Sequence, residues 1–200
     1  MMVIDAKSIV RLQDAMTTAW HQDRGAHSTQ FGVAATPLLA LVEREHAANF
    51  DLWHEEDGAR DPKAEDAAIA RIKRSIDRIN QQRNDAIEAL DDLLLETLPP
   101  MGDTAPLHSE TPGMIIDRLS ILALKIFHMR EQAERVVAGE EHVAASRAKL
   151  QVLEAQRSDL QAALGHLAME LEAGSRRFKR YRQMKMYNDP ALNPAVYGRN

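Results

Sequence analysis

The sequence predicts an all-α fold, an elongated bundle of five to six helices. Only 4% of the residues are aromatic and nine of 200 are glycine, while Ala, Leu, Glu, Arg and Ile are abundant, a composition that favours helices over sheets. Between residues 63 and 98, apolar residues recur in alternating steps of three and four, the period of a helix packed against other helices. Between 112 and 138, apolar residues occur on nearly every side, so we expect a largely buried central helix there.

The first three helices are predicted from periodicity and from cap residues. Residues 4–23 form a moderately amphipathic helix. Thr36-Pro37 supplies an N-cap and a first helical position for a second helix that ends near residue 60. Asp61-Pro62 is expected to repeat this cap for the third helix, 64–98, which ends at a Pro-Pro pair.

The second half of the chain completes one domain spanning 1–200. Thr111-Pro112 opens the central helix, and a long helix over 140–173 lies between two glycines. We expect a short basic helix over 175–187 and a surface tail over 188–200.

Charge is unevenly distributed along the chain. The net charge is −5, yet residues 175–200 carry seven Lys and Arg against one Asp, so the remainder is strongly acidic. A basic end on an acidic body is expected to neutralise the protein's own carboxylates. Binding of nucleic acid is not expected, because the body is acidic and no known nucleic-acid-binding module is present.

Composition also bears on compartment and chemistry. The sequence has no cysteine, which excludes disulfides, thiolate nucleophiles and thiolate metal sites. It has no apolar run of 18 residues, and the first residues, MMVIDAKSIVRL, lack the apolar core of a signal peptide. We therefore expect no membrane span and a cytoplasmic location.

Two polar stripes are the candidate functional features. On the 64–98 helix, helical spacing places Lys73, Asp77, Asn80, Asn84, Glu88 and Asp91 beside the apolar seam. On the 112–138 helix, Arg118, Lys125, His128 and Gln132 share one face. If the stripes converge near the His54-Glu55-Glu56-Asp57 cluster, cations for an anionic ligand meet carboxylates that serve as a base or as magnesium ligands. Alternatively, the same residues form a buried salt-bridge network that fixes helix register, and Arg83 is a paired core arginine.

Metal and cofactor patterns are incomplete. Glu88 and Asp91 match one half of the carboxylate pattern of a magnesium-dependent helical nucleotide pyrophosphohydrolase, whereas the second half lacks its last acid because Ala59 stands there. The sequence therefore leaves open whether a divalent metal such as magnesium is a cofactor, and no other cofactor is predicted.

Four segments resemble an uncharacterised bacterial family of unknown function: LWHEEDGAR (52–60), KRSIDRINQQRND (73–85), ETPGMIIDRLSILALKIFHM (110–129) and YRQMKMYNDPALNP (181–194). The resemblance implies a soluble helical protein whose genes lie beside glycosyltransferase and lipopolysaccharide-assembly genes. It therefore implies work on bacterial envelope glycans. Most of the candidate residues lie within these segments.

The candidate catalytic residues are His54, Glu56, Asp57, Asp77, Glu88 and His128, and the candidate ligand-binding residues are Arg60, Lys73, Asn80, Arg83, Asn84, Arg118, Lys125, Gln183 and Lys185. The first hypothesis is a protein that binds, or transforms, an anionic sugar phosphate or nucleotide-sugar in envelope polysaccharide or lipopolysaccharide synthesis. The second is a non-enzymatic helical partner of a glycosyltransferase or a self-associating scaffold. A pyrophosphohydrolase-like enzyme is a further alternative.

Overall fold

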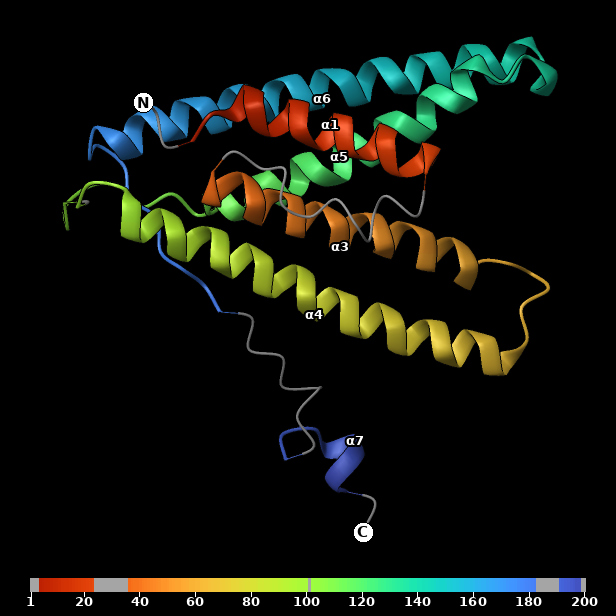
Figure 1. Ribbon diagram of the computed structural model, residues 1–200, viewed down its shortest axis with the longest axis horizontal. Coiled ribbons are helices and arrows are strands. Elements are labelled where there is room, and N and C mark those ends of the chain that lie inside the picture. Colours follow the sequence, from red (N-terminus) through yellow and green to blue (C-terminus); the bar gives the residue numbers. More distant parts are fainter. Residues whose placement is uncertain (1–3, 24–35, 101, 183–190, 199–200) are drawn as a thin grey trace.

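The computed structural model describes residues 4–23, 36–100, 102–182 and 191–198, and these form an all-α bundle (Figure 1). Its five long helices are α1 (Ala6–Gln22), α3 (Pro37–Ala59), α4 (Asp66–Thr97), α5 (Pro112–Glu134) and α6 (Glu140–Glu172). A 3-10 turn, η1 (Val136–Ala138), joins α5 to α6, and a short helix, α7 (Pro194–Tyr197), follows later. The described residues contain no β-strand, so the predicted all-α class is confirmed.

Helix α5 is the element on which the bundle is assembled. Helices α3 and α4 form one antiparallel hairpin, and α5 and α6 form a second (Figure 1). In addition to α6, α5 packs against α1, α3 and α4. It is therefore the buried central helix that its all-round apolar sequence predicts. No helix in the described ranges is long and apolar enough to cross a membrane.

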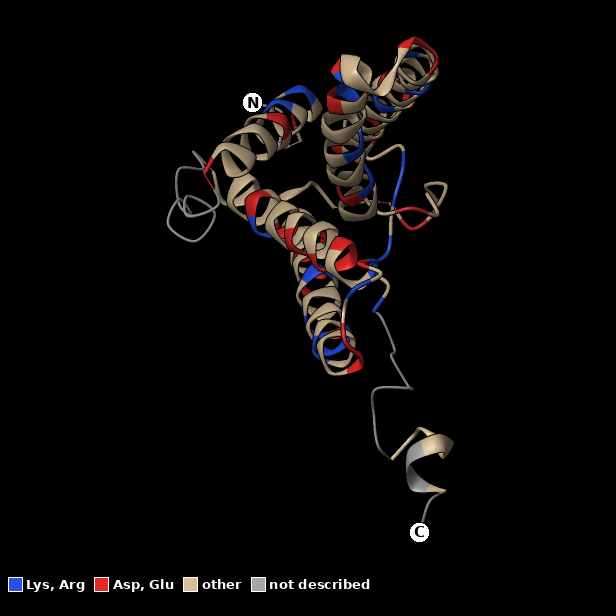
Figure 2. Ribbon diagram, turned by 90° about the vertical axis from the view of Figure 1, so that its right-hand side faces the viewer, with Lys and Arg blue, Asp and Glu red and all other residues tan. Residues whose placement is uncertain are grey.

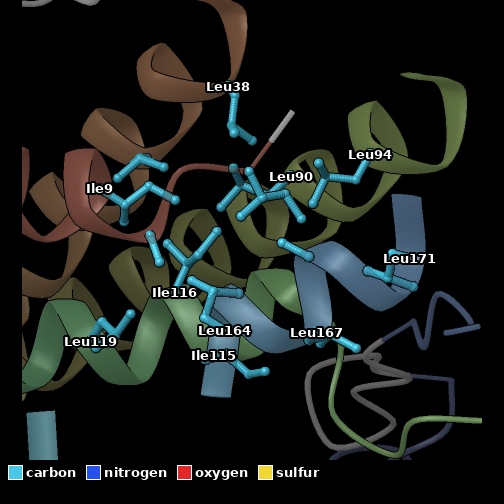
Figure 3. Close-up of a cluster of buried hydrophobic side chains, with 14 of the residues drawn as sticks. Ile9, Leu38, Leu90, Leu94, Ile115, Ile116, Leu119, Leu164, Leu167 and Leu171 are labelled. Atoms are coloured by element: carbon cyan, nitrogen blue, oxygen red, sulfur yellow. The ribbon is translucent and has the colours of Figure 1, made fainter. Parts of the chain in front are cut away.

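The main apolar cluster lies where the beginnings of α1, α3 and α5 meet the ends of α4 and α6 (Figure 3). Ile9, Leu90, Ile116 and Leu164 are fully buried in it. Burial of such a side chain contributes about 1.5–3 kcal/mol to folding. Two smaller clusters, around Trp20 and around Ile79, occupy the other half of the bundle, where polar groups are also buried.

Helix boundaries agree with the predicted caps in two of three cases. The Thr36 and Thr111 side chains accept hydrogen bonds from the first turns of α3 and α5, each with proline at the first helical positions. The predicted Asp61 cap of α4 is wrong. Asp61 accepts from Lys63 N in a turn, and α4 begins at Asp66. At the other end, α5 stops at Glu134 rather than 138, because Arg135 leaves the helical conformation.

The predicted basic helix over 175–187 is wrong for the residues that the structure describes. Residue 175 is a bend, and residues 176–182 contain no helix and form an open segment that is largely blue for Lys and Arg in Figure 2. Arg177 forms a bridge with Leu107 through His108 N→Arg177 O (2.7 Å) and Arg177 N→Pro106 O (3.1 Å). Phe178 is buried in the main cluster, while Arg176 pairs with Glu170 and Arg180 with Asp92. A segment without helical structure can reach these partners on different elements, which explains why no helix forms here.

Residues 183–187 lie outside the described ranges. In the predicted surface tail the structure describes 191–198, where Leu192 is exposed.

Helices α4 and α5 approach closely at Gly113. A Cβ atom at this position would lie 2.8 Å from both Asp91 Oδ1 and Ile87 O. The Gly113 N–H donates to Asp91 Oδ1 at 2.8 Å, and burial raises the pKa of Asp91 to about 6 despite the hydrogen bonds that it accepts. The glycine of the ETPG sequence is therefore required for helix packing.

Candidate functional site

A buried polar network joins α3, α4 and α5 beside the main apolar cluster. Arg83 on α4 donates from Nε to Asp117 Oδ1 at 2.5 Å and from Nη2 to Asp117 Oδ2. The two N–H bonds of Asn49 Nδ2 on α3 are shared among three acceptors: Asp117 Oδ1 and Ser120 Oγ, each at 3.0 Å, and Glu45 Oε1. The side chain of Asp117 is 8% exposed and that of Arg83 is 25% exposed. This two-pronged ion pair is therefore shielded from water and links α4 to α5.

His46 extends the network to α1. Thr17 Oγ1 donates to Gln13 O at 2.8 Å, so it accepts from His46 Nε2 at 2.9 Å. His46 Nδ1 lies 2.8 Å from Ser120 Oγ. The ring also stacks on Trp20 at a centroid distance of 5.4 Å. These partners hold a fully buried histidine that carries a proton on Nε2.

Glu45 is the uncharged acid of the network. Burial, and next the neighbouring Asp117 charge, raise the pKa of Glu45 well above its usual range. Burial alone would also raise the pKa of Asp117, but hydrogen bonds from Arg83 and from Glu45 lower it. Glu45 Oε2 is buried and receives no hydrogen bond. An oxygen of an uncharged carboxyl group costs less to leave without a donor than an oxygen of a carboxylate does.

A pocket of about 420 Å³ opens above this network, and we call it the α3–α4–α5 pocket. It is lined by Asn49, Leu52, Trp53, Glu56, Asp57, Arg60, Asn80, Arg83, Ile121 and Leu124. Its two cations are already paired with acids. Arg60 lies 3.0 Å from Glu56 and 4.0 Å from Asp57, and Arg83 is held by Asp117. This pocket thus offers amides, carboxylates and an aromatic wall, but no uncompensated positive charge.

A second hollow of about 540 Å³ lies between α5 and α6, and we call it the α5–α6 groove. It is lined by Trp53, Lys125, His128, Met129, Gln132, Lys149, Val152, Leu153 and Gln156. No Asp or Glu is among these lining residues, and in the described ranges neither lysine forms an ion pair. Trp53 lines both this groove and the α3–α4–α5 pocket. The two hollows therefore share an aromatic wall but differ in charge.

Aromatic rings from α1, α3 and α5 gather at that wall; they are His21, Phe50, Trp53, His54, Phe127 and His128. The His128 ring stacks on Trp53 at 4.7 Å with an interplanar angle of 8°. His54 Nδ1 donates to Phe50 O at 2.8 Å. Two of the candidate catalytic residues, His54 and His128, thus lie in one cluster, with ring centroids 6.4 Å apart.

The structure brings some predicted site residues together and leaves others apart. Glu56, Asp57, Arg60, Asn80 and Arg83 line the α3–α4–α5 pocket, and Lys125 and His128 line the α5–α6 groove.

The expected convergence of the two polar stripes is not found. Asp77 is about half exposed and pairs with Lys73 on its own helix. Arg118 binds Glu110 at 2.7 Å and lines a neighbouring hollow with Lys125 and Asp159. Asn84 and Glu88 are half-buried and line neither the pocket nor the groove. Gln183 and Lys185 lie outside the described residues.

Of the alternatives left open by the sequence, only the pairing of Arg83 is found. Arg83 is a paired arginine in a buried polar network, but that network consists of other residues than those of the two stripes, whose pairs Lys73–Asp77 and Arg118–Glu110 are exposed. The two halves of the pyrophosphohydrolase pattern do not meet, because Glu56 faces the pocket whereas Asp91 is held against Gly113. Among the described residues, no group of three or more His, Asp or Glu side chains is close enough to hold a metal ion.

Several residues of the site were not singled out as candidates. Glu45 and Asn49 lie four residues apart, so helical spacing places them on one face of the helix, but Arg44 and His46 beside Glu45 hide the signal of a buried acid. Asp117 follows Ile115 and Ile116 on an apolar helix, which could have marked it as a buried polar group. Lys149 carries no such signal, because it is one of many charged residues on α6. His21 occupies the last turn of α1, outside the four resembling segments.

Fold and site together define an all-α bundle with a polar network buried beneath paired hollows. The chain belongs to the family described as "Protein of unknown function (DUF4254)", whose model matches residues 39–180. This match confirms the resemblance to an uncharacterised family. Comparison with curated proteins finds no match, and comparison with solved structures finds none either.

Proposed function

We propose that the protein binds an anionic sugar phosphate or nucleotide-sugar, with the phosphate in the α5–α6 groove. The observation that carries this proposal is that Lys125 and Lys149 line the groove with no acid among the lining residues, while His128, which pairs with Glu131, adds a third basic group. Lysines that form no ion pair with any residue that the structure describes attract phosphate, whereas the paired Arg60 and Arg83 would have to give up a carboxylate first. The groove also offers Gln132 and Gln156 as hydrogen-bonding groups.

The uncharged part of the ligand extends past Trp53 into the α3–α4–α5 pocket. Small-molecule sites are mostly apolar or aromatic, with a few polar groups that fix orientation. The pocket fits this description through Trp53, Ile121 and Leu124, with Asn49 and Asn80 as amides. Glu56 and Asp57 are the acids placed to accept from sugar hydroxyls or to act as a base. We place this function in the cytoplasm, in the synthesis of envelope polysaccharide or lipopolysaccharide that the family resemblance implies.

Calorimetry and thermal shift with the full chain test the proposal. The panel contains sugar 1-phosphates, nucleoside diphosphate sugars and inorganic pyrophosphate as the minimal anion, each with and without magnesium. A ligand at a hundred times its dissociation constant should stabilise the fold by about 2.7 kcal/mol. In Lys125→Gln and Lys149→Gln, affinity should fall about tenfold each, the effect of about 1.4 kcal/mol.

Lys63→Gln is the matched control, because Lys63 is exposed and lines neither hollow. Its affinity should equal that of the unmodified chain. Absence of binding across the panel, or equal losses in all three variants, would refute the groove as an anion site.

A non-enzymatic role as a docking partner is the second candidate. Val136 and Val137 are 81% and 92% exposed at the turn between α5 and α6. Two adjacent apolar side chains at a tip suit a contact with a glycosyltransferase or with a second copy of this chain. Sedimentation velocity over a range of concentrations tests self-association, which the double change Val136→Ser and Val137→Ser should abolish. A monomer at every concentration would leave only the heterologous partner, to be tested by co-purification with the same double variant.

A further inference from the structure

His128, which lines the α5–α6 groove, is contacted by a histidine on α1. His21 Nε2 lies 3.2 Å from His128 Nε2, and the two residues are 107 positions apart in sequence. His21 Nδ1 lies 2.7 Å from the carbonyl oxygen of Thr17. A carbonyl only accepts, so the His21 proton is on Nδ1 and its Nε2 is an acceptor. The hydrogen bond between the rings therefore runs from His128 Nε2–H to His21 Nε2.

The other nitrogen of His128 also has an acceptor. His128 Nδ1 lies 2.9 Å from Glu131 Oε2, and a carboxylate accepts a hydrogen bond from an N–H. With both nitrogens donating, the ring is the imidazolium form. Its stacking on Trp53 at 4.7 Å places this positive charge against the face of an indole, which stabilises a cation.

His21 is built to remain the neutral partner. Its ring stacks on Phe127 at 4.1 Å and meets the edge of Phe50 at 4.9 Å. Burial, and the neighbouring His128 and His54, lower the pKa of His21, although its bond to Thr17 acts in the opposite direction. An uncharged His21 keeps the Nε2 lone pair that the bond from His128 requires.

The charged and titratable groups around His128 come from four helices. His21 faces it from α1 and His54 from α3. Glu131 pairs with it on α5, and Lys125 of α5 and Lys149 of α6 line the same groove. Glu131 is the acid that offsets the imidazolium, and the two lysines add to the positive charge that the groove presents.

We propose that His21 is a positioning residue for the α5–α6 groove: by accepting from His128 Nε2, it fixes that ring as a cation stacked on Trp53. The role in ligand binding rests on the proposed function, whereas the hydrogen bond between the two histidines does not. The hydrogen bond between the rings requires a hydrogen on His128 Nε2 and none on His21 Nε2. It is lost when His21 takes up a second proton in acid, because His21 Nε2 then carries a hydrogen and no longer accepts.

Nitrogen NMR of the full chain with ¹⁵N-labelled histidine tests the bond without any ligand. At pH 6, His128 should show two protonated ring nitrogens and His21 a single proton on Nδ1. A scalar coupling across the hydrogen bond should connect the two Nε2 nuclei. A proton on Nε2 of His21, or absence of the coupling while both rings keep one fixed tautomer, would overturn the assignment.

Two substitutions at His21 separate positioning from packing. His21→Phe keeps an aromatic ring but removes the acceptor, whereas His21→Gln places an amide oxygen near the position of Nε2. With inorganic pyrophosphate as the probe in calorimetry, affinity should fall about fivefold in His21→Phe, the effect of one partly screened charge contact. His21→Gln should stay within about twofold of the unmodified chain, as should the control His166→Gln, an exposed residue on α6.

The possible failures are distinguishable. If pyrophosphate does not bind the unmodified chain, the proposed groove function fails, while the NMR result still decides the role of His21. If the two His21 variants lose affinity equally, His21 contributes packing and the positioning role is refuted. If His21→Phe does not fold, the comparison of His21→Gln with the unmodified chain, together with its spectrum, gives the decision.

Discussion

The α3–α4–α5 pocket and the α5–α6 groove share Trp53 but treat their cations differently. In the pocket, Arg83 is paired with the buried carboxylate of Asp117. The buried network beneath the pocket adds a second acid, Glu45, which is uncharged. In the groove, Lys125 and Lys149 project from α5 and α6 without an acid in the lining. A cation at helical spacing thus has a structural role where the facing helix supplies a buried acid. It is available to a ligand where the facing helix supplies none.

The largest expected effect is in the pocket. Arg83→Met leaves Asp117 as a buried charge without its counter-ion, so the free energy of unfolding should fall by about 3–5 kcal/mol. Denaturant melts with the double variant Arg83→Met and Asp117→Asn measure the coupling, and the double change should restore part of the loss. A loss below about 1 kcal/mol would mean that the pair is no more structural than the groove lysines.

Glu45→Gln tests whether the buried network beneath the pocket contains an uncharged acid. The pKa of Glu45 is raised in the folded state, so its contribution to stability is full below its unfolded value and is lost as pH rises through the folded value. The Gln variant should therefore gain stability relative to the unmodified chain as pH increases above about 4.5, by at most about 1.4 kcal/mol per pH unit. Melting curves between pH 4 and pH 9 measure this difference. Parallel curves would show that Glu45 ionises normally.

The smallest expected effect is in the groove. Lys125→Gln and Lys149→Gln should each change the free energy of unfolding by less than about 0.5 kcal/mol, because neither lysine has an ion-pair partner in the described ranges and Lys125 is exposed. Repeating the melts at high salt checks the interpretation, since mutual repulsion of the lysines would be screened. A loss comparable to that of Arg83→Met would make the groove a second structural site and remove the contrast.

Much of the fold could be predicted from local sequence. The Thr-Pro pairs that begin α3 and α5 act within one helical turn, so their effect did not depend on the rest of the chain. The all-round apolar character of α5 likewise required neighbours on every side. The prediction of a helix after Gly174 was wrong because the conformation of this segment is determined by residues distant in the sequence. Phe178 inserts into the main cluster, and Arg177 pairs with the backbone next to Leu107.

The candidate site was less accessible to sequence reasoning. Periodicity identified which face each residue occupies, and it correctly grouped Lys125 with His128. It could not show which helix faces that stripe, and α6 rather than α4 forms the other wall of the groove. For the same reason, Asp77 was expected near Lys125 but pairs instead with Lys73. Partner choice depends on the order in which helices pack, which a single periodic pattern does not encode.

The segment 176–180 has a consequence for where the stable body of the protein ends. Arg176 binds the end of α6, Phe178 enters the main cluster, and Arg180 binds α4, so three separate elements are tied together within five residues. The sequence contains four trypsin sites here, after Arg176, Arg177, Lys179 and Arg180. The backbone of Arg177, however, is hydrogen-bonded to both Pro106 and His108, which should protect it from cleavage. A chain shortened to end at Gly174 would keep every long helix and still lose the clasp that joins α4 to α6.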